Sequence, residues 1–134
     1  ATHAIGDVAI EATLDAYEAC FGASLRDASP RIEHCAVLRE DLVERIAELG
    51  VVACIQPSFA VSDEQHRIAG LGDRYPTAYL WDRLINAGGR VVFGSDYPIE
   101  SLDPMVGLRD LSVAGPGHID LGTATQIMTS TPYS

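Results

Sequence analysis

The sequence predicts an α/β protein built on an all-parallel sheet. Short apolar segments alternate with longer amphipathic segments along the chain, and the apolar segments end at glycine, proline or polar residues. Strands and helices in this order form right-handed βαβ units with parallel neighbouring strands. At 134 residues, of which 47% are hydrophobic, the chain has the size of one domain, or of part of a larger one, and can bury a core.

The first half of the chain contains two predicted helices and one predicted strand. Residues 8–21 carry acidic residues only along one solvent-facing stripe, with Asp7 as the expected N-cap and Gly22 as the stop. Residues 31–37 alternate as in a strand, which would place Ile32 and His34 on one face. Residues 39–49 form a second amphipathic pattern that ends at Gly50. These elements give the order helix, strand, helix.

The second half continues the alternation. Residues 51–55 form a continuous apolar strand that ends at Gln56, and residues 58–77 lack clear periodicity, as expected of a long functional loop. Helical spacing returns over residues 78–86, followed by a strand over residues 90–95. A loosely helical stretch follows Pro104, then Gly115-Pro116-Gly117, and a last helix is expected around residues 124–128.

The segment from Val91 to Pro98 ends a buried strand with a carboxylate. Its apolar run stops at Gly94 and Ser95, and Asp96 follows directly. The carboxyl edge of a parallel sheet faces the ligand crevice, which makes Asp96 a candidate functional residue. An aspartate that caps the next turn would give the same pattern, so the motif alone leaves both interpretations open.

Composition argues against several classes of partner. The formal charge of -10 argues against a surface for nucleic acid or anionic membrane. All nine basic residues are arginine, so no lysine is available as a general base or carbamate ligand. The three cysteines are widely spaced without a C-x-x-C pair, which suggests small buried residues rather than disulfides or a zinc knuckle. With no apolar run near the ~20 residues of a membrane span and no signal segment, a cytoplasmic protein is expected.

Four polar residues are expected to converge at the carboxyl edge of the sheet: His3, His34, Gln56 and Asp96. Two imidazoles and one carboxylate from separate strands are ligand types that zinc, iron and manganese accept. A lone histidine on a strand is more often a hydrogen-bonded structural residue, so spacing alone keeps that alternative open. An ion pair between Arg31 and Glu33 would support His34.

Other residues have simpler interpretations. His66 and His118 are expected to be solvated loop residues, and Trp81 is expected to pack in the core. Ser95 lies outside any G-x-S-x-G turn, and Gly88-Gly89 lacks the lysine and hydroxyl of a phosphate loop. The sequence therefore indicates neither a serine hydrolase nor a nucleotide site.

Several motifs together resemble the amidohydrolase superfamily, in the branch called amidohydrolase family 3, which includes N-substituted formamide deformylases. They are His3-Ala4-Ile5-Gly6-Asp7, Arg31-Ile32-Glu33-His34, Ile55-Gln56-Pro57 followed by Ser62-Asp63, Gly94-Ser95-Asp96-Tyr97-Pro98, and the closing Thr129-Ser130-Thr131-Pro132. The agreement in order and spacing covers nearly the whole chain.

The resemblance implies that residues 1–134 form a single partial domain. This would be the C-terminal half of a distorted TIM (β/α)8 barrel, with strands five to eight and their helices. The family holds one or two divalent metal ions at the barrel mouth, and zinc is expected. By resemblance, His3 and His34 match the metal ligands of strands five and six, and Asp96 matches the strand-eight residue that binds metal and acts as general base. Gln56 is a candidate substrate-binding residue.

The implied reaction is hydrolysis of a non-peptide C–N bond in an amide-like small molecule, in which a metal activates water and Asp96 accepts the proton. The family's His-x-His pair is absent here, as is any lysine. The isolated chain is therefore expected to be inactive, and to self-associate or to pair with the missing N-terminal half-barrel. The alternative from another class is a non-catalytic α/β module that binds a small ligand in the same crevice.

Overall fold

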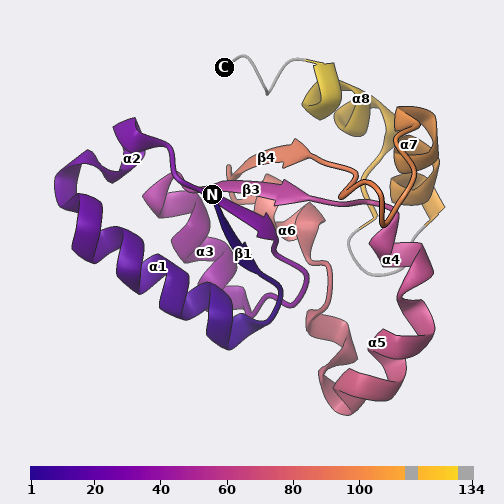
Figure 1. Cartoon of the computed structure of the whole chain (residues 1–134), viewed down its shortest axis with the longest axis horizontal. Coiled ribbons are helices and arrows are strands. Elements are labelled where there is room, and N and C mark those ends of the chain that lie inside the picture. The colour runs from indigo at the N-terminus through magenta and orange to yellow at the C-terminus, as the bar shows by residue number, and fades with distance from the viewer. Residues whose placement is uncertain (114–117, 130–134) are drawn as a thin grey trace.

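The computed structural model describes residues 1–113 and 118–129 and contains a four-stranded parallel sheet in the order β1-β2-β3-β4 (Figure 1). The strands are β1 (Thr2–Ala4), β2 (Arg31–His34), β3 (Val52–Ile55) and β4 (Arg90–Phe93). Every neighbouring pair is parallel. The predicted α/β class with a parallel sheet is confirmed.

Helices connect consecutive strands. The first two connections contain α1 (Asp7–Phe21), the 3-10 turn η1 (Gly22–Ser24), α2 (Leu25–Ala28) and α3 (Glu40–Leu49). The third contains α4 (Phe59–Ser62), α5 (Glu64–Leu71), η2 (Gly72–Thr77) and α6 (Trp81–Asn86). After β4 come α7 (Pro104–Val113) and α8 (Leu121–Thr129). In Figure 1, α4 and α5 lie toward the end of the sheet to which the strand arrows point.

The core lies between the sheet and these helices. Alternate strand residues on one face are almost fully buried, among them Ile32, Ala53, Ile55 and Val91. Trp81 is 1% exposed, which confirms its expected place in the core. Gly50 ends α3 with a φ of 67°, as predicted, because that left-handed backbone suits glycine at a helix C-terminus.

Arginines join α1 to α3 across the surface. Arg45 on α3 pairs with Asp15, at 2.7 Å from Nη2 to Oδ1, and with Glu18. Arg39, just before α3, places Nη2 3.1 Å from Glu11 Oε2. The acidic stripe expected along residues 8–21 therefore forms ion pairs with the neighbouring helix as well as facing solvent.

Several predicted boundaries were wrong. The strand expected over residues 31–37 ends at His34, because His34 and Cys35 have φ values of 80° and 48°, outside the extended region. The strand expected over residues 90–95 likewise ends at Phe93. Gly6, not Asp7, is the N-cap of α1; Asp7 begins the helix and accepts a 3.0 Å hydrogen bond from the Val8 amide.

The expected loop at residues 58–77 is largely helical, since it contains α4, α5 and η2. The helix expected over residues 78–86 begins only at Trp81, and the last helix is longer than expected, over Leu121–Thr129. Gly115-Pro116-Gly117 and Ser130-Thr131-Pro132 lie outside the described residues. No helix in the described ranges is long and apolar enough to cross a membrane.

Within the described residues, β1 and β4 each pair with only one neighbouring strand. The two outer strands therefore have unpaired backbone groups along one side. The sheet face opposite the helices carries His3, Arg31, Glu33 and Cys54, and Arg31 Nε lies 2.6 Å from Glu33 Oε1, which confirms that expected ion pair. This mixed polar face differs from the apolar face that packs on the helices.

Candidate functional site

Four predicted site residues border one cavity at the carboxyl end of the sheet. The cavity has a volume of about 150 Å³ and is lined by His3, His34, Gln56 and Asp96, together with other residues that include Asp63. They come from β1, from the end of β2, and from the segments that follow β3 and β4. The fold thus brings together residues that are up to 93 positions apart in the sequence, from residue 3 to residue 96.

The two histidines are in direct contact. Their ring centroids lie 4.5 Å apart with an interplanar angle of 72°, and the His34 ring also lies 6.0 Å from that of Phe59. Because His34 has a φ of 80°, its side chain does not continue the alternation begun by Ile32. The expectation that Ile32 and His34 share one face is therefore wrong: Ile32 is fully buried, whereas the half-buried His34 meets His3.

Gln56 is buried behind His34, with only 4% of its surface exposed. Its Nε2 donates a 3.1 Å hydrogen bond to the carbonyl of Cys54, and its side chain lies close enough to His34 to raise the pKa of that imidazole. Since Nε2 is directed at the carbonyl, the amide oxygen is the atom suited to accept from the imidazole. Gln56 is therefore placed to orient the His34 ring.

Asp96 lies three residues beyond β4 and is exposed to solvent. Its φ is 57°, and its carbonyl accepts a 2.9 Å hydrogen bond from the Ile99 amide. Left-handed backbone is uncommon outside glycine, and such positions concentrate at functional sites. Of the five non-glycine residues with positive φ among the described positions, His34, Tyr79 and Asp96 line this cavity.

The environment of His34 favours the neutral imidazole. Burial lowers the pKa of His34, and the nearby His3 lowers it further. Asp96, Glu33 and the hydrogen bond with Gln56 act in the opposite direction, but the net pKa is below the ordinary value of 6.5. At neutral pH, His34 therefore has a free nitrogen lone pair, which is the form that binds metal.

The two cysteines near the cavity, Cys35 and Cys54, are not among the residues that line it. Burial raises the pKa of Cys35 to about 12 and that of Cys54 to about 12, so both thiols stay protonated at neutral pH. Cys35 and Cys54 are buried and free, as expected from the sequence, whereas Cys20 is exposed, which was not expected.

The donor types at the cavity fit a divalent metal, although the set is incomplete. His3, His34 and Asp96 supply two imidazole nitrogens and a carboxylate, which zinc accepts. Within residues 1–113 and 118–129, however, no three His, Cys, Asp or Glu side chains are arranged to hold an ion on their own. Further ligands or a rearrangement of these side chains would be required.

The sequence did not single out Tyr79 or Arg67 as site residues. Tyr79 lines the cavity beside Asp63, and its ring lies 4.7 Å from that of Trp81 and 4.8 Å from the guanidinium carbon of Arg67. Tyr79 was expected within a helix, and Arg67 within a segment without periodicity. No pattern in the sequence distinguished either residue.

The remaining histidines lie apart from His3 and His34. His66 is on α5 rather than in a loop, and its side chain is 88% exposed. His118 is also exposed. The expected exposure of both residues is confirmed.

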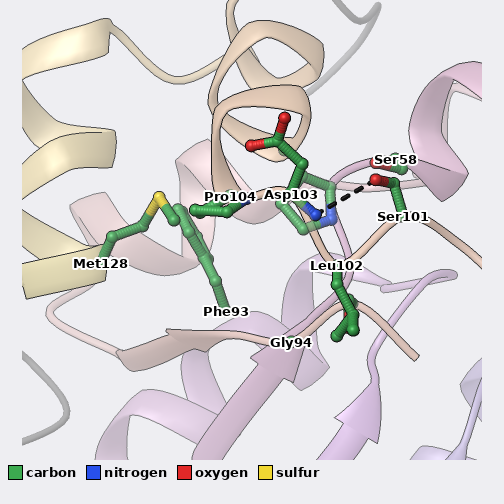
Figure 2. Close-up of a pocket in the computed structure, with 11 residues that line it drawn as sticks. Ser58, Phe93, Gly94, Ser101, Leu102, Asp103, Pro104 and Met128 are labelled. Atoms are coloured by element: carbon green, nitrogen blue, oxygen red, sulfur yellow. Dashed lines mark hydrogen bonds between the residues drawn. The ribbon is translucent and has the colours of Figure 1, made fainter. Parts of the chain in front are cut away.

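A separate cavity of about 180 Å³ lies beside the end of β4 (Figure 2). Phe93, Pro104 and Met128 form apolar parts of its wall, from β4, α7 and α8. Ser101 accepts a 3.1 Å hydrogen bond from the Asp103 amide at its rim. It contains no histidine and shares no lining residue with the cavity at His34.

Comparison with known proteins gives a family match over residues 1–132, to the family described as "Amidohydrolase family". The protein named "Putative amidohydrolase YtcJ" of Bacillus subtilis (strain 168) is 39% identical over 119 residues, which cover 88% of this chain and 22% of that protein. The N-substituted formamide deformylase of Arthrobacter pascens is 29% identical over 106 residues, 78% of this chain and 20% of that protein.

Two solved structures also match. An uncharacterized metal-dependent hydrolase from Pyrococcus furiosus has a TM-score of 0.81 and 31% identity, over 96% of this chain and 27% of that chain. One from Pyrococcus horikoshii OT3 has a TM-score of 0.73 and 28% identity, over 97% of this chain and 26% of that chain. This chain thus spans about a fifth of the length of these curated relatives and about a quarter of the solved chains.

Proposed function

Because this chain belongs to the amidohydrolase family, we propose that it is part of a metal-dependent hydrolase and supplies strands five to eight of its barrel. The observation that carries this proposal is the cavity at the carboxyl ends of the strands, where His3, His34 and Asp96 meet. This is the edge at which barrel enzymes place their catalytic groups. The similarity to two metal-dependent hydrolases supports the same function.

In this proposal, His3, His34 and Asp96 hold one or two divalent metal ions, with zinc as the expected metal. A metal ion bound there supplies a Lewis acid that lowers the pKa of water and polarises a carbonyl group. The neutral state of His34 and its contact with Gln56 prepare the imidazole for this role. The ligands that this chain lacks come from the rest of the barrel.

Asp96 acts as the general base on a non-peptide C–N bond, such as an amide or formamide. It accepts a proton from the water whose oxygen attacks the carbonyl carbon, and returns that proton to the nitrogen as the C–N bond breaks. Its exposure at the cavity rim leaves the carboxylate accessible to water. Gln56 borders the same space and is a candidate substrate contact. A cytoplasmic location stays a prediction.

The free sides of the two outer strands, β1 and β4, are proposed to pair with further strands. Among the described residues, β1 and β4 each have one unpaired side, and such edges favour pairing with further strands. The other half of the barrel would cover both edges, and a second copy of this chain is the alternative. The isolated chain should therefore be inactive. Size-exclusion chromatography with light scattering should find self-association, and a well-behaved monomer would contradict this part of the proposal.

Metal analysis tests the site directly. In the protein where this chain is joined to the rest of its barrel, His34→Ala and Asp96→Ala should lower bound metal, measured by plasma mass spectrometry. His118→Ala is the matched control, because His118 is exposed and lies outside the cavity. Unchanged metal content in both site variants would exclude the enzyme and favour a non-catalytic module that binds a small ligand.

A further inference from the structure

Arg67 is a buried cation in the segment that follows β3. Its side chain is 4% exposed, and it is the buried residue of α5. The guanidinium carbon lies 4.9 Å from the Tyr75 ring centroid and 4.8 Å from that of Tyr79. Nη2 donates a 3.2 Å hydrogen bond to the Tyr75 hydroxyl and lies 3.9 Å from Glu64 Oε1. The two rings fix the position of the guanidinium group.

Two nitrogens of this group are left without a partner. Nε and Nη1 are buried and make no hydrogen bond to any residue in the described part of the chain. Buried polar atoms are almost always paired, and a buried N–H donor without an acceptor is costly. These two N–H donors therefore need acceptor oxygens that the described residues do not supply.

A cavity of about 250 Å³ borders Arg67 and could hold such an acceptor. It adjoins the cavity that holds His3 and His34, because both are lined by Ile5, Ala36, Asp63 and Tyr79. A molecule with its reacting bond beside His34 could therefore extend past Tyr79 toward the guanidinium group. The arrangement links Arg67 to the space in which the substrate is proposed to bind.

We propose that Arg67 binds a carboxylate group of the substrate in this second cavity. A guanidinium group is permanently charged, and its planar donors match carboxylate oxygens. Asp63 lines the cavity and Glu64 lies near Nη2, so a singly charged carboxylate fits better than a phosphate with two charges. This assignment rests on the proposed function and refines it: the substrate is an amide that also bears a carboxylate.

The test compares an acid with its neutral analogue, in metal-free protein. N-acetylglycine and N-acetylglycinamide differ in the carboxylate alone, and calorimetric titration in the presence of a chelator measures the affinity of each. The wild-type protein should bind the acid about tenfold more tightly than the amide. Arg67→Gln should lower the affinity for the acid to that for the amide and leave the amide unchanged. Arg67→Lys should keep only part of the wild-type difference in affinity between acid and amide, since a lysine carries the charge but lacks the planar donor set.

Arg83→Gln is the matched control, because Arg83 lies on α6 in an exposed pair with Glu40 and the substitution removes the same charge. Equal affinities for acid and amide in the wild-type protein would overturn the proposal. This comparison uses the wild-type protein alone, so it does not depend on whether a variant folds. If Arg67→Gln still preferred the acid, the proposal would also be overturned. It would likewise be overturned if the wild-type protein bound inorganic phosphate more tightly than N-acetylglycine. Because no metal is present, loss of the metal site in the earlier test and loss of acid binding here are separate results.

Discussion

The imidazole rings of His3 and His34 lie edge to face, with centroids 4.5 Å apart. They come from adjacent strands, β1 and β2, in which Ala4 lies opposite His34. A second positive charge at this distance is unfavourable, and it adds to burial in lowering the pKa of His34. The pair therefore provides a neutral imidazole at the cavity without help from a metal.

In the intact enzyme, where this chain is joined to the rest of its barrel, Asp96→Asn should remove most turnover and leave the fold intact. The amide cannot accept a proton as the carboxylate does, and loss of a general base typically costs about 10²- to 10⁴-fold in rate. Asparagine also tolerates the left-handed backbone at this position, where φ is 57°. Turnover and urea unfolding measured on the same preparations check both parts. Asp27→Asn, at an exposed site on α2, is the control, and near-normal turnover in Asp96→Asn would rule out the role of base.

Gln56→Met should weaken metal binding by about 10- to 100-fold, because methionine has a similar size but its side chain offers no amide oxygen to accept a hydrogen bond from the His34 ring. Competition with a chelator measures the metal affinity, and circular dichroism checks that the sheet remains folded. Gln65→Met, at an exposed position of α5, should have no effect. Equal affinity in Gln56→Met and wild type would mean that Gln56 does not position His34.

Gly94→Ala should destabilise the chain by about 1 kcal/mol through crowding. A Cβ at this position would lie 3.1 Å from Cys54 Sγ and 3.6 Å from Gln56 Nε2. The cost should fall in a Cys54→Ala background, where the sulfur is removed, and a double-mutant cycle of urea unfolding measures this difference. Gly70→Ala is the control, since its Cβ would meet nothing within 4 Å. The same cost in both backgrounds would contradict the crowding.

Asp7 should make the fold more sensitive to acid. Burial raises its pKa, but hydrogen bonds from Arg74 and the Val8 amide, with the charges of Arg74 and Arg39, outweigh burial and leave the pKa below 3.8. The charged form therefore stabilises the folded state above pH 3.8, and this contribution is lost as pH falls through the lower folded-state value. Asp7→Asn should cost about 0.5 kcal/mol at neutral pH, given solvent screening, and nothing in strong acid.

Thermal unfolding of the wild type and Asp7→Asn from neutral pH to about pH 2.5 checks this prediction. The two curves should converge as the pH falls, because protonated Asp7 resembles asparagine in charge. Asp73→Asn, at an exposed position outside these ion pairs, is the control. A constant difference between the wild type and Asp7→Asn at every pH would contradict the ionic explanation.

The regular elements could be predicted because their buried residues follow simple periods. Residues 39–49 place Leu42, Val43 and Ile46 on one buried face, and this pattern identifies α3. Residues 64–71 give no such signal, because the residue that α5 buries is Arg67. Its burial depends on Tyr75 and Tyr79, which lie outside α5, so hydrophobic periodicity could not reveal it.

The convergence of four residues at the candidate site was predictable from the sequence, but the shape of the site was not. Polar residues at the ends of apolar strands identified His3, His34, Gln56 and Asp96 as neighbours, and all four line one cavity. The positive φ values of His34 and Asp96 could not be inferred, since nothing in their residue types requires left-handed backbone. The cavity beside Arg67 could not be predicted either, because α5, which contributes to its wall, buries an arginine and so gives no hydrophobic period.

Trp81 is the single tryptophan of the chain, and its buried indole N–H donates a 3.1 Å hydrogen bond to the Cys35 carbonyl, next to His34. Its ring also contacts Tyr79, which faces Arg67. Trp81 itself lines the cavity at His34, so the emission of this natural fluorophore should respond to a ligand bound there. Ligand entry beside His34 should therefore be measurable optically in the unlabelled chain, with no dye to disturb the packing around that residue.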